Sequence, residues 1–129
     1  NWLIGQVHDI TNKRIENAAR LDAGLSSIPG IRIPPRPNRF RPVYHLYIVF
    51  AERRDELYRF CEDRGIECKV HYPIPLYQQD GLKQFGYKAG DFPVADRQAT
   101  EIITFPADQH ITFEQVDYVV ETVREFYGA

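Results

Sequence analysis

The prolines limit where this chain can form regular structure, because each one fixes its own backbone and removes a backbone N–H donor. Four of the nine prolines fall between residues 31 and 42, beside four arginines, and predict an extended surface loop. Pro29 stops the helical pattern before that loop, and Pro73 with Pro75 excludes a continuing central strand. Helices and short strands are expected between these breaks.

The first half of the chain predicts a long helix followed by a strand, a helix and a strand. Apolar residues at steps of three and four indicate the helix from Leu3 to Leu25. The aliphatic and aromatic run at 45–51 predicts a central strand buried on both faces. A helix over 54–64, closed by Gly65, precedes a second strand at 66–72.

The second half begins irregularly and ends in a well-marked helix. Interrupting glycines predict short turns over 76–94, then a short helix at 95–103 leads into a brief strand at 104–105. Thr112 and Gln115 form a capping box, with Ile111 and Val116 as the hydrophobic staple of the last helix. We expect the sheet to cover the apolar stripe of that helix, which consists of Val116, Val119, Val120, Val123 and Phe126.

This order of elements predicts an α/β fold of the α+β kind, with a small, mostly antiparallel sheet of about three strands covered by helices. With 129 residues, 43% of them hydrophobic, we expect one domain spanning 1–129. Residues 1–28 would be a connecting helix and residues 43–129 the body. A free-standing module that binds a small ligand or serves regulation could have the same form, so the fold alone decides no function.

Composition narrows the partners and the compartment. The 16 basic and 18 acidic side chains nearly cancel, so no nucleic-acid partner is expected. No apolar stretch is long enough to cross a bilayer, so no membrane partner is expected either. Two cysteines without a disulfide pattern favour the cytoplasm. Since the chain begins with Asn1 and contains no Met, we expect it to be a piece of a longer protein.

The most informative run is 65–76, in which a strand delivers His71 and Tyr72 to its end and then turns at Pro73. Strand ends are where α/β folds place ligand-binding groups. The imidazole can donate to a phosphate or a hydroxyl, and the phenol offers a hydrogen bond and an apolar face. The residues alone also allow a simpler interpretation, in which the pair caps the sheet edge with satisfied hydrogen bonds.

Several short motifs in a fixed order resemble one known family, the DegT/DnrJ/EryC/StrS-type sugar aminotransferases of the aspartate-aminotransferase fold. The motifs are Arg-x-x-Asn-Ala at 14–18, His-Leu-Tyr at 45–47, Arg-Arg-Asp-Glu-Leu at 53–57, Gly-Ile-Glu and His-Tyr-Pro-x-Pro-Leu within 65–76, Gly-Asp-Phe-Pro-x-Ala at 90–95, and Val-x-x-Phe-Tyr at 123–127. The resemblance spans nearly the whole chain.

The resemblance implies the C-terminal small domain of a fold-type I enzyme that depends on pyridoxal phosphate. Such enzymes are homodimers that move an amino group, usually from glutamate, to a keto-sugar on a nucleotide diphosphate. His71 and Tyr72 match the pair that contacts this substrate. The family's cofactor lysine lies in a larger N-terminal domain, which this chain lacks. The chain's own lysines, which occupy surface-like positions, are Lys13, Lys69, Lys83 and Lys88. The fragment alone is therefore expected to be inactive.

Other residue groups carry weaker hypotheses. The arginines of the proline-rich loop, Arg32, Arg36, Arg39 and Arg41, could clamp a diphosphate, although a solvated, mobile loop is favoured. Residues 81–88 nearly match a phosphate loop but lack its lysine and hydroxyl, so that site is rejected. Cys61, Cys68 and His71 fit no zinc spacing, so buried free thiols are expected. Asp108 and His110 could be an acid–base pair, but a polar turn before a capped helix explains them.

Overall fold

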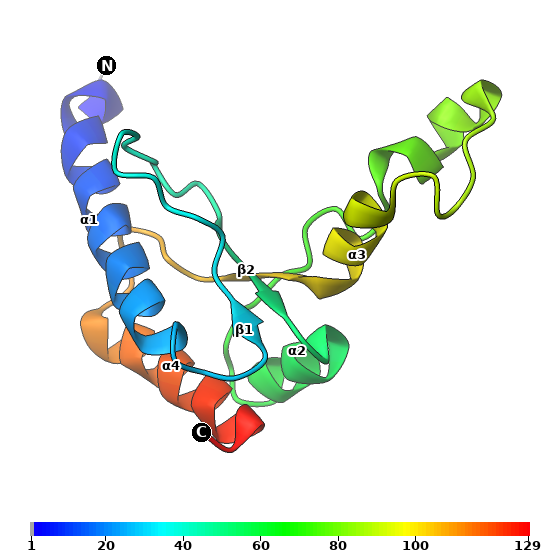
Figure 1. Cartoon of the computed structure of the whole chain (residues 1–129). Helices are drawn as coiled ribbons and strands as arrows, with labels where there is room; N and C mark the ends of the chain where they lie inside the picture. The colour runs from blue at the N-terminus through cyan, green and yellow to red at the C-terminus, as the bar shows by residue number, and fades with distance from the viewer. Residues whose placement is uncertain (1) are drawn as a thin grey trace.

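The computed structural model describes residues 2–129 and contains a three-stranded antiparallel sheet in the order β1–β2–β3 (Figure 1). The elements, in chain order, are α1 (Trp2–Leu25), β1 (Ile31–Arg32), β2 (Tyr47–Ala51), α2 (Arg54–Glu62), the 3₁₀ helices η1 (Leu76–Gln78) and η2 (Asp80–Phe85), α3 (Pro93–Glu101), β3 (Ile102–Phe105) and α4 (Phe113–Tyr127). The predicted class, a small antiparallel sheet covered by helices, is confirmed, and the run at 45–51 supplies the central strand.

The central strand β2 is buried on one face and not on both, which corrects the sequence prediction. Tyr47 and Val49 are at most 1% exposed, whereas Ile48 and Phe50 are half-buried. The cause is the placement of the helices: α1, α2 and α4 share one hydrophobic core with a single face of the sheet. The opposite face is covered less completely.

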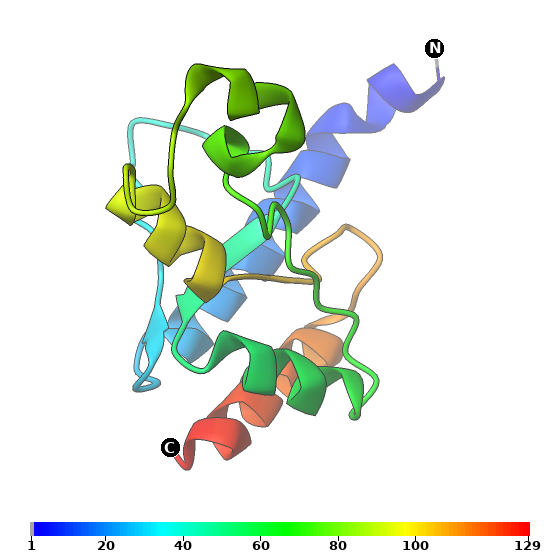
Figure 2. The ribbon, with the colours of Figure 1, turned by 90° about the vertical axis from the view of Figure 1, so that its right-hand side faces the viewer.

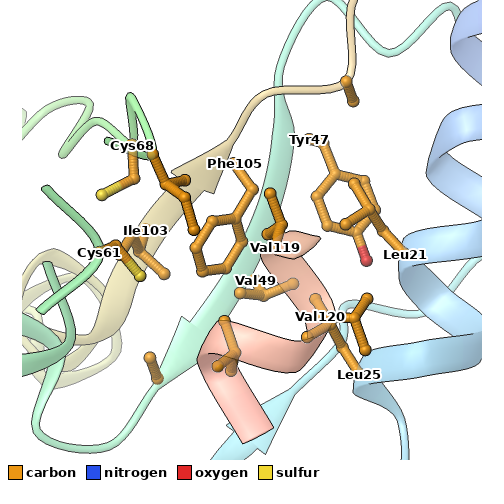
Figure 3. Packing of buried hydrophobic residues seen from close by; sticks show 14 of the residues in the cluster. Leu21, Leu25, Tyr47, Val49, Cys61, Cys68, Ile103, Phe105, Val119 and Val120 are labelled. Atoms are coloured by element: carbon orange, nitrogen blue, oxygen red, sulfur yellow. The ribbon is translucent and has the colours of Figure 1, made fainter. Parts of the chain in front are cut away.

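The core lies between that face and the three helices. Figure 3 shows side chains from α1 and α4 meeting side chains from β2 and β3. The labelled residues in this layer are Leu21, Leu25, Val119, Val120, Tyr47, Val49, Ile103 and Phe105. The α1 and α4 helices approach closely at Gly24, where an added Cβ would lie 2.6 Å from both Cγ atoms of Val120.

The start of α4 is built as the sequence predicts. The Thr112 hydroxyl accepts the Gln115 N–H, and the Gln115 side chain accepts the Thr112 N–H, which completes the capping box. Four of the five stripe residues are at most 9% exposed, but Phe126 is only half-buried. Its ring lies 5.3 Å from that of Phe60, so this end of the stripe packs beside α2.

The predicted strand at 66–72 is reduced to one isolated bridge, between Lys69 and Thr104. Before the bridge, the Cys68 N–H bonds locally to the Ile66 carbonyl at 2.9 Å and does not join a ladder. After the bridge, Tyr72 has a left-handed backbone (φ 58) and Pro73 follows, so the chain turns away from β3. Local turns on both sides therefore prevent a longer strand.

The proline-rich loop is extended, as predicted, but it is anchored to the body. Its first residues form β1, which pairs with Ala51 and Phe50 of β2. Further along, the Arg36 guanidinium binds both carboxylate oxygens of Asp22 on α1, at 3.2 and 3.3 Å, and also donates to the Ile48 carbonyl. These contacts correct the expectation of a mobile loop, because a bidentate ion pair and strand pairing both restrain the loop.

Residues 72–92 form an arm that extends away from the body, with α3 at its base (Figures 1 and 2). The expected short helical turns are present as η1 and η2. The arm has a small aromatic cluster of its own, in which the rings of Tyr77 and Phe92 lie 4.8 Å apart and those of Tyr87 and Phe92 lie 5.2 Å apart. Its outer side chains, such as Leu76 and Phe85, are exposed.

Candidate functional site

A polar cavity of about 180 Å³ lies where the start of β2 meets the end of β3. The antiparallel pairing of these strands brings the segment before Tyr47 beside the segment after Phe105. Two cationic side chains, two histidines and two carboxylates line its wall. The charged and titratable lining residues are Arg14, His45, Lys69, His71, Glu67 and Asp108.

The predicted site residue His71 lines this cavity. Its ring is half-buried, and Nδ1 lies 3.0 Å from the Thr104 hydroxyl on β3. This bond is the kind that the simple capping interpretation requires. It also fixes the ring while using only one of its two nitrogens, so Nε2 is the atom that can donate to or accept from a ligand.

The second predicted site residue, Tyr72, lies outside the cavity lining, at the start of the arm. Its side chain is 76% exposed, and its ring centroid is 6.4 Å from that of His71. A left-handed backbone is uncommon for a tyrosine and clusters at functional sites. The structure therefore brings the two residues side by side but points them to different environments.

Two side chains from α1 position the cavity wall. Arg14 donates to the Gln109 side chain at 2.9 Å and to the Tyr44 carbonyl at 3.1 Å. Asn17 is 3% exposed and donates to the Asp108 carbonyl at 2.7 Å. The Arg-x-x-Asn-Ala motif thus ties together two loops distant in sequence. The sequence signal for this role is a polar side chain on the buried face of a helix, which requires a partner.

Three of the four loop arginines are engaged in hydrogen bonds with protein groups. Besides the Arg36–Asp22 pair, Arg32 binds Glu101 at 2.7 Å and Arg41 donates to Asn12 at 2.7 Å. The Tyr47 hydroxyl donates to Asp22 at 2.7 Å. Burial, and to a lesser extent this hydrogen bond, raises the pKa of Tyr47. A diphosphate clamp would have to break several of these contacts.

The remaining sequence candidates have structural explanations. Cys61 and Cys68 are buried free thiols, as predicted, and the hydrogen bond between them, together with burial, raises the pKa of Cys61. Within residues 2–129, no group of three potential ligands is arranged to hold a metal ion. Asp108 accepts the backbone N–H of His110 at 2.7 Å, as in an ordinary polar turn. Among the helices of the described region, none has the length and hydropathy of a membrane span.

The lysines do not provide the environment that a covalently bound pyridoxal phosphate needs. Lys69 and Lys83 are 52% and 73% exposed and pair with the carboxylates of Glu67 and Asp80. Lys13 and Lys88 are also exposed. A lysine activated for imine chemistry is desolvated or placed beside other cations, and these are neither.

The comparisons with known proteins identify first the fold and then the family of this chain. The fold matches that of DesV from Streptomyces venezuelae, with a TM-score of 0.92, at 30% identity over 98% of this chain and 34% of that one. Residues 4–124 match the DegT/DnrJ/EryC1/StrS aminotransferase family, and the chain belongs to it. The resemblance found in the motifs is thereby confirmed.

The relatives among well-described proteins are longer than this chain. It is 33% identical to the dTDP-3-amino-3,4,6-trideoxy-alpha-D-glucose transaminase of Streptomyces venezuelae, over 88% of this chain and 30% of that protein. It is 30% identical to the erythromycin biosynthesis sensory transduction protein EryC1 of Saccharopolyspora erythraea, over 90% of this chain and 32% of that protein. The chain therefore covers about a third of these relatives.

Proposed function

We propose that this chain is the C-terminal small domain of an aminotransferase that depends on pyridoxal phosphate and aminates a nucleotide-linked keto-sugar, with glutamate as the amino donor. The observation that carries the proposal is the close match of the whole chain to DesV, together with a polar cavity beside the family's His-Tyr pair. Several relatives are named as transaminases of dTDP- or UDP-linked sugars. We further propose a cytoplasmic homodimer.

The proposed role of the domain is to bind and orient the sugar nucleotide. His71 offers Nε2 to a phosphate or hydroxyl oxygen, while Thr104 fixes its ring through Nδ1. Tyr72 offers an exposed phenol and ring face at the base of the arm. Arg14 and Asn17 hold the loops of the cavity wall in place.

Pyridoxal phosphate, when bound, would carry the amino group between the donor and the sugar. Because the four lysines of this chain are exposed, we place the cofactor in a part of the enzyme outside these 129 residues. We expect the isolated chain to bind the cofactor no better than an unrelated protein. Titration with pyridoxal phosphate, borohydride reduction and mass spectrometry measure this; one covalently trapped cofactor per chain would contradict the proposal.

The substrate role of His71 is tested in the full-length enzyme. His71→Ala should weaken sugar-nucleotide binding by about 1–3 kcal/mol, the cost of losing a hydrogen bond to a charged group. The half-reaction with glutamate should keep its rate. His110→Ala, an exposed histidine in the polar turn, is the matched control. Equal losses in both half-reactions for His71→Ala would make this residue structural and refute the assignment.

The second candidate function is a regulatory module that binds a small ligand by itself. It is favoured by one relative, the pleiotropic regulatory protein of Geobacillus stearothermophilus, which is 41% identical over 66% of this chain. Calorimetry of the isolated chain with dTDP-glucose tests a module of the sugar-nucleotide-binding kind: a self-sufficient module should bind it at micromolar concentration, whereas one domain of a larger enzyme holds only part of the site and should bind it more weakly.

A further inference from the structure

We infer that Asp96 is a positioning residue for Tyr72: it anchors one end of a short segment, residues 72–77, whose other end is anchored to β3. The inference rests on the proposed function, in which Tyr72 contacts the sugar nucleotide. Asp96 lies in the first turn of α3, far from the cavity lining, so it would act on the ligand only through Tyr72.

The chain before Tyr72 is fixed to β3. Lys69 and Thr104 exchange two backbone hydrogen bonds, of 3.0 and 2.9 Å. His71 then bonds through its ring to the Thr104 hydroxyl at 3.0 Å. Three contacts to one residue leave little freedom on the upstream side of Tyr72.

The chain after Tyr72 is fixed to α3 through Asp96. The hydroxyl of Tyr77, a residue only 8% exposed, donates to Oδ1 of Asp96. The Gln78 side chain donates to the same oxygen at 2.8 Å, and the Gly90 N–H donates to Oδ2 at 2.9 Å. One carboxylate therefore gathers donors from both ends of the arm.

The two anchors lie on elements that follow each other without a loop, because α3 ends at Glu101 and β3 begins at Ile102. The intervening segment 72–77 is short and contains Pro73 and Pro75, whose rings fix their own φ angles. A stiff segment between two fixed points leaves Tyr72 to absorb the change of direction. This explains its positive φ, since strained backbone persists where the surroundings over-determine it.

Asp96→Asn in the full-length enzyme tests the inference. The amide keeps the size of the side chain and one acceptor oxygen, but its NH₂ group cannot accept the Gly90 N–H. The KM for the sugar nucleotide should rise about 3- to 10-fold, the range of one lost hydrogen bond, while kcat and the glutamate half-reaction stay unchanged. Hydrogen exchange of the Gly90 amide should accelerate, with that of α4 unaffected. Should this variant not fold, Tyr77→Phe removes one donor and should raise the KM about 2- to 3-fold.

Two comparisons make the result specific. Asp91→Asn is the matched control: Asp91 lies in the same arm and accepts the local Lys88 N–H at 2.8 Å, so its loss should leave the KM unchanged. In the Tyr72→Ala background, Asp96→Asn should raise the KM no further, because its effect passes through Tyr72.

The possible failures differ. If Asp96→Asn raises the KM equally with and without Tyr72, or does not raise it although Tyr72→Ala does, the inference is wrong and the proposed function stands. If Tyr72→Ala itself leaves the KM unchanged, the proposed role of Tyr72 is wrong and the inference fails with it.

Discussion

Tyr72 combines backbone strain with solvent exposure. Its φ of 58° is costly for a side chain with a Cβ, whereas its 76% exposure means that little packing would be lost on truncation. Stability and function should therefore separate at this position more clearly than at a buried one.

We predict that Tyr72→Gly is more stable than Tyr72→Ala by about 1 kcal/mol, since glycine adopts positive φ without steric cost. Glycine normally ranks below alanine by a similar amount, so the order is inverted here. Urea unfolding of both variants measures the difference. Tyr118, an exposed tyrosine within α4, supplies the control pair, in which alanine should exceed glycine. Alanine exceeding glycine at both positions would show that Tyr72 is unstrained.

At the scale of elements, the contact between α1 and α4 depends on Gly24. Helix propensity alone would make Gly24→Ala stabilising by about 1 kcal/mol. The added Cβ, however, would overlap both Cγ atoms of Val120 at 2.6 Å, and overpacking typically costs about 1–3 kcal/mol. Whether Gly24→Ala raises or lowers the free energy of unfolding therefore reports how rigidly the two helices are packed.

We predict that Gly24→Ala lowers the free energy of unfolding, and that the double variant with Val120→Ala behaves differently from the sum of the two single changes. Removing the Val120 methyls opens the space that the new Cβ needs, so the coupling energy should be favourable by about 1 kcal/mol or more. Urea unfolding of the four proteins measures the cycle. Strict additivity would mean that the helices separate to admit the Cβ.

The same pair of helices carries an ion pair on its surface, in which Arg20 donates to both oxygens of Asp117 at 2.5 and 2.6 Å. The hydrogen bond from Arg20 holds the pKa of Asp117 below its ordinary value of 3.8. A depressed carboxyl pKa contributes stability that is complete above the unfolded pKa and is lost as pH falls through the folded one.

We therefore predict that Asp117→Asn lowers the urea midpoint at pH 7, and that the difference from the unmodified chain shrinks as pH falls below about 4 and is lost below the folded-state pKa of Asp117. Added salt should also reduce the difference, because both side chains are more than 40% exposed. Glu121→Gln, an exposed change on the same helix, is the control. A difference that does not shrink between pH 5 and pH 2.5 would show that the aspartate acts otherwise than through its charge.

At the scale of the molecule, the features that the sequence predicts are those whose signals are local. The period of α1 and the capping box at Thr112 depend on neighbouring residues, and both are confirmed. The strand at 66–72 was overestimated because β-propensity does not reveal where a partner strand ends, and β1 was missed because two paired residues leave no pattern. His71, a candidate because it ends a strand-like run, lines the cavity.

The support of the site could not be predicted, because its contacts join distant parts of the chain. Arg14 meets Gln109 across 95 positions, and Asn17 meets Asp108 across 91. Arg36 was interpreted as part of a mobile loop because its partner, Asp22, lies on a helix that the sequence orients only by its apolar face. Ion pairs of this kind depend on how α1 packs, so they cannot be predicted before that packing is known.

The anchored proline-rich loop also determines how a protease would divide the chain. Trypsin cleaves poorly before proline, so Arg36–Pro37 and Arg41–Pro42 should resist it, while the exposed bond Arg39–Phe40 should be cut. Two polypeptides divided at this bond, 1–39 and 40–129, would share the interface between α1 and α4 and the pairing of β1 with β2, and the Arg36–Asp22 pair would secure the loop end of the shorter piece to α1. We expect them to elute together in size-exclusion chromatography under native conditions and to separate in urea. Separately expressed pieces should then reassemble, which would make residue 39 a point at which the domain can be built from two polypeptides.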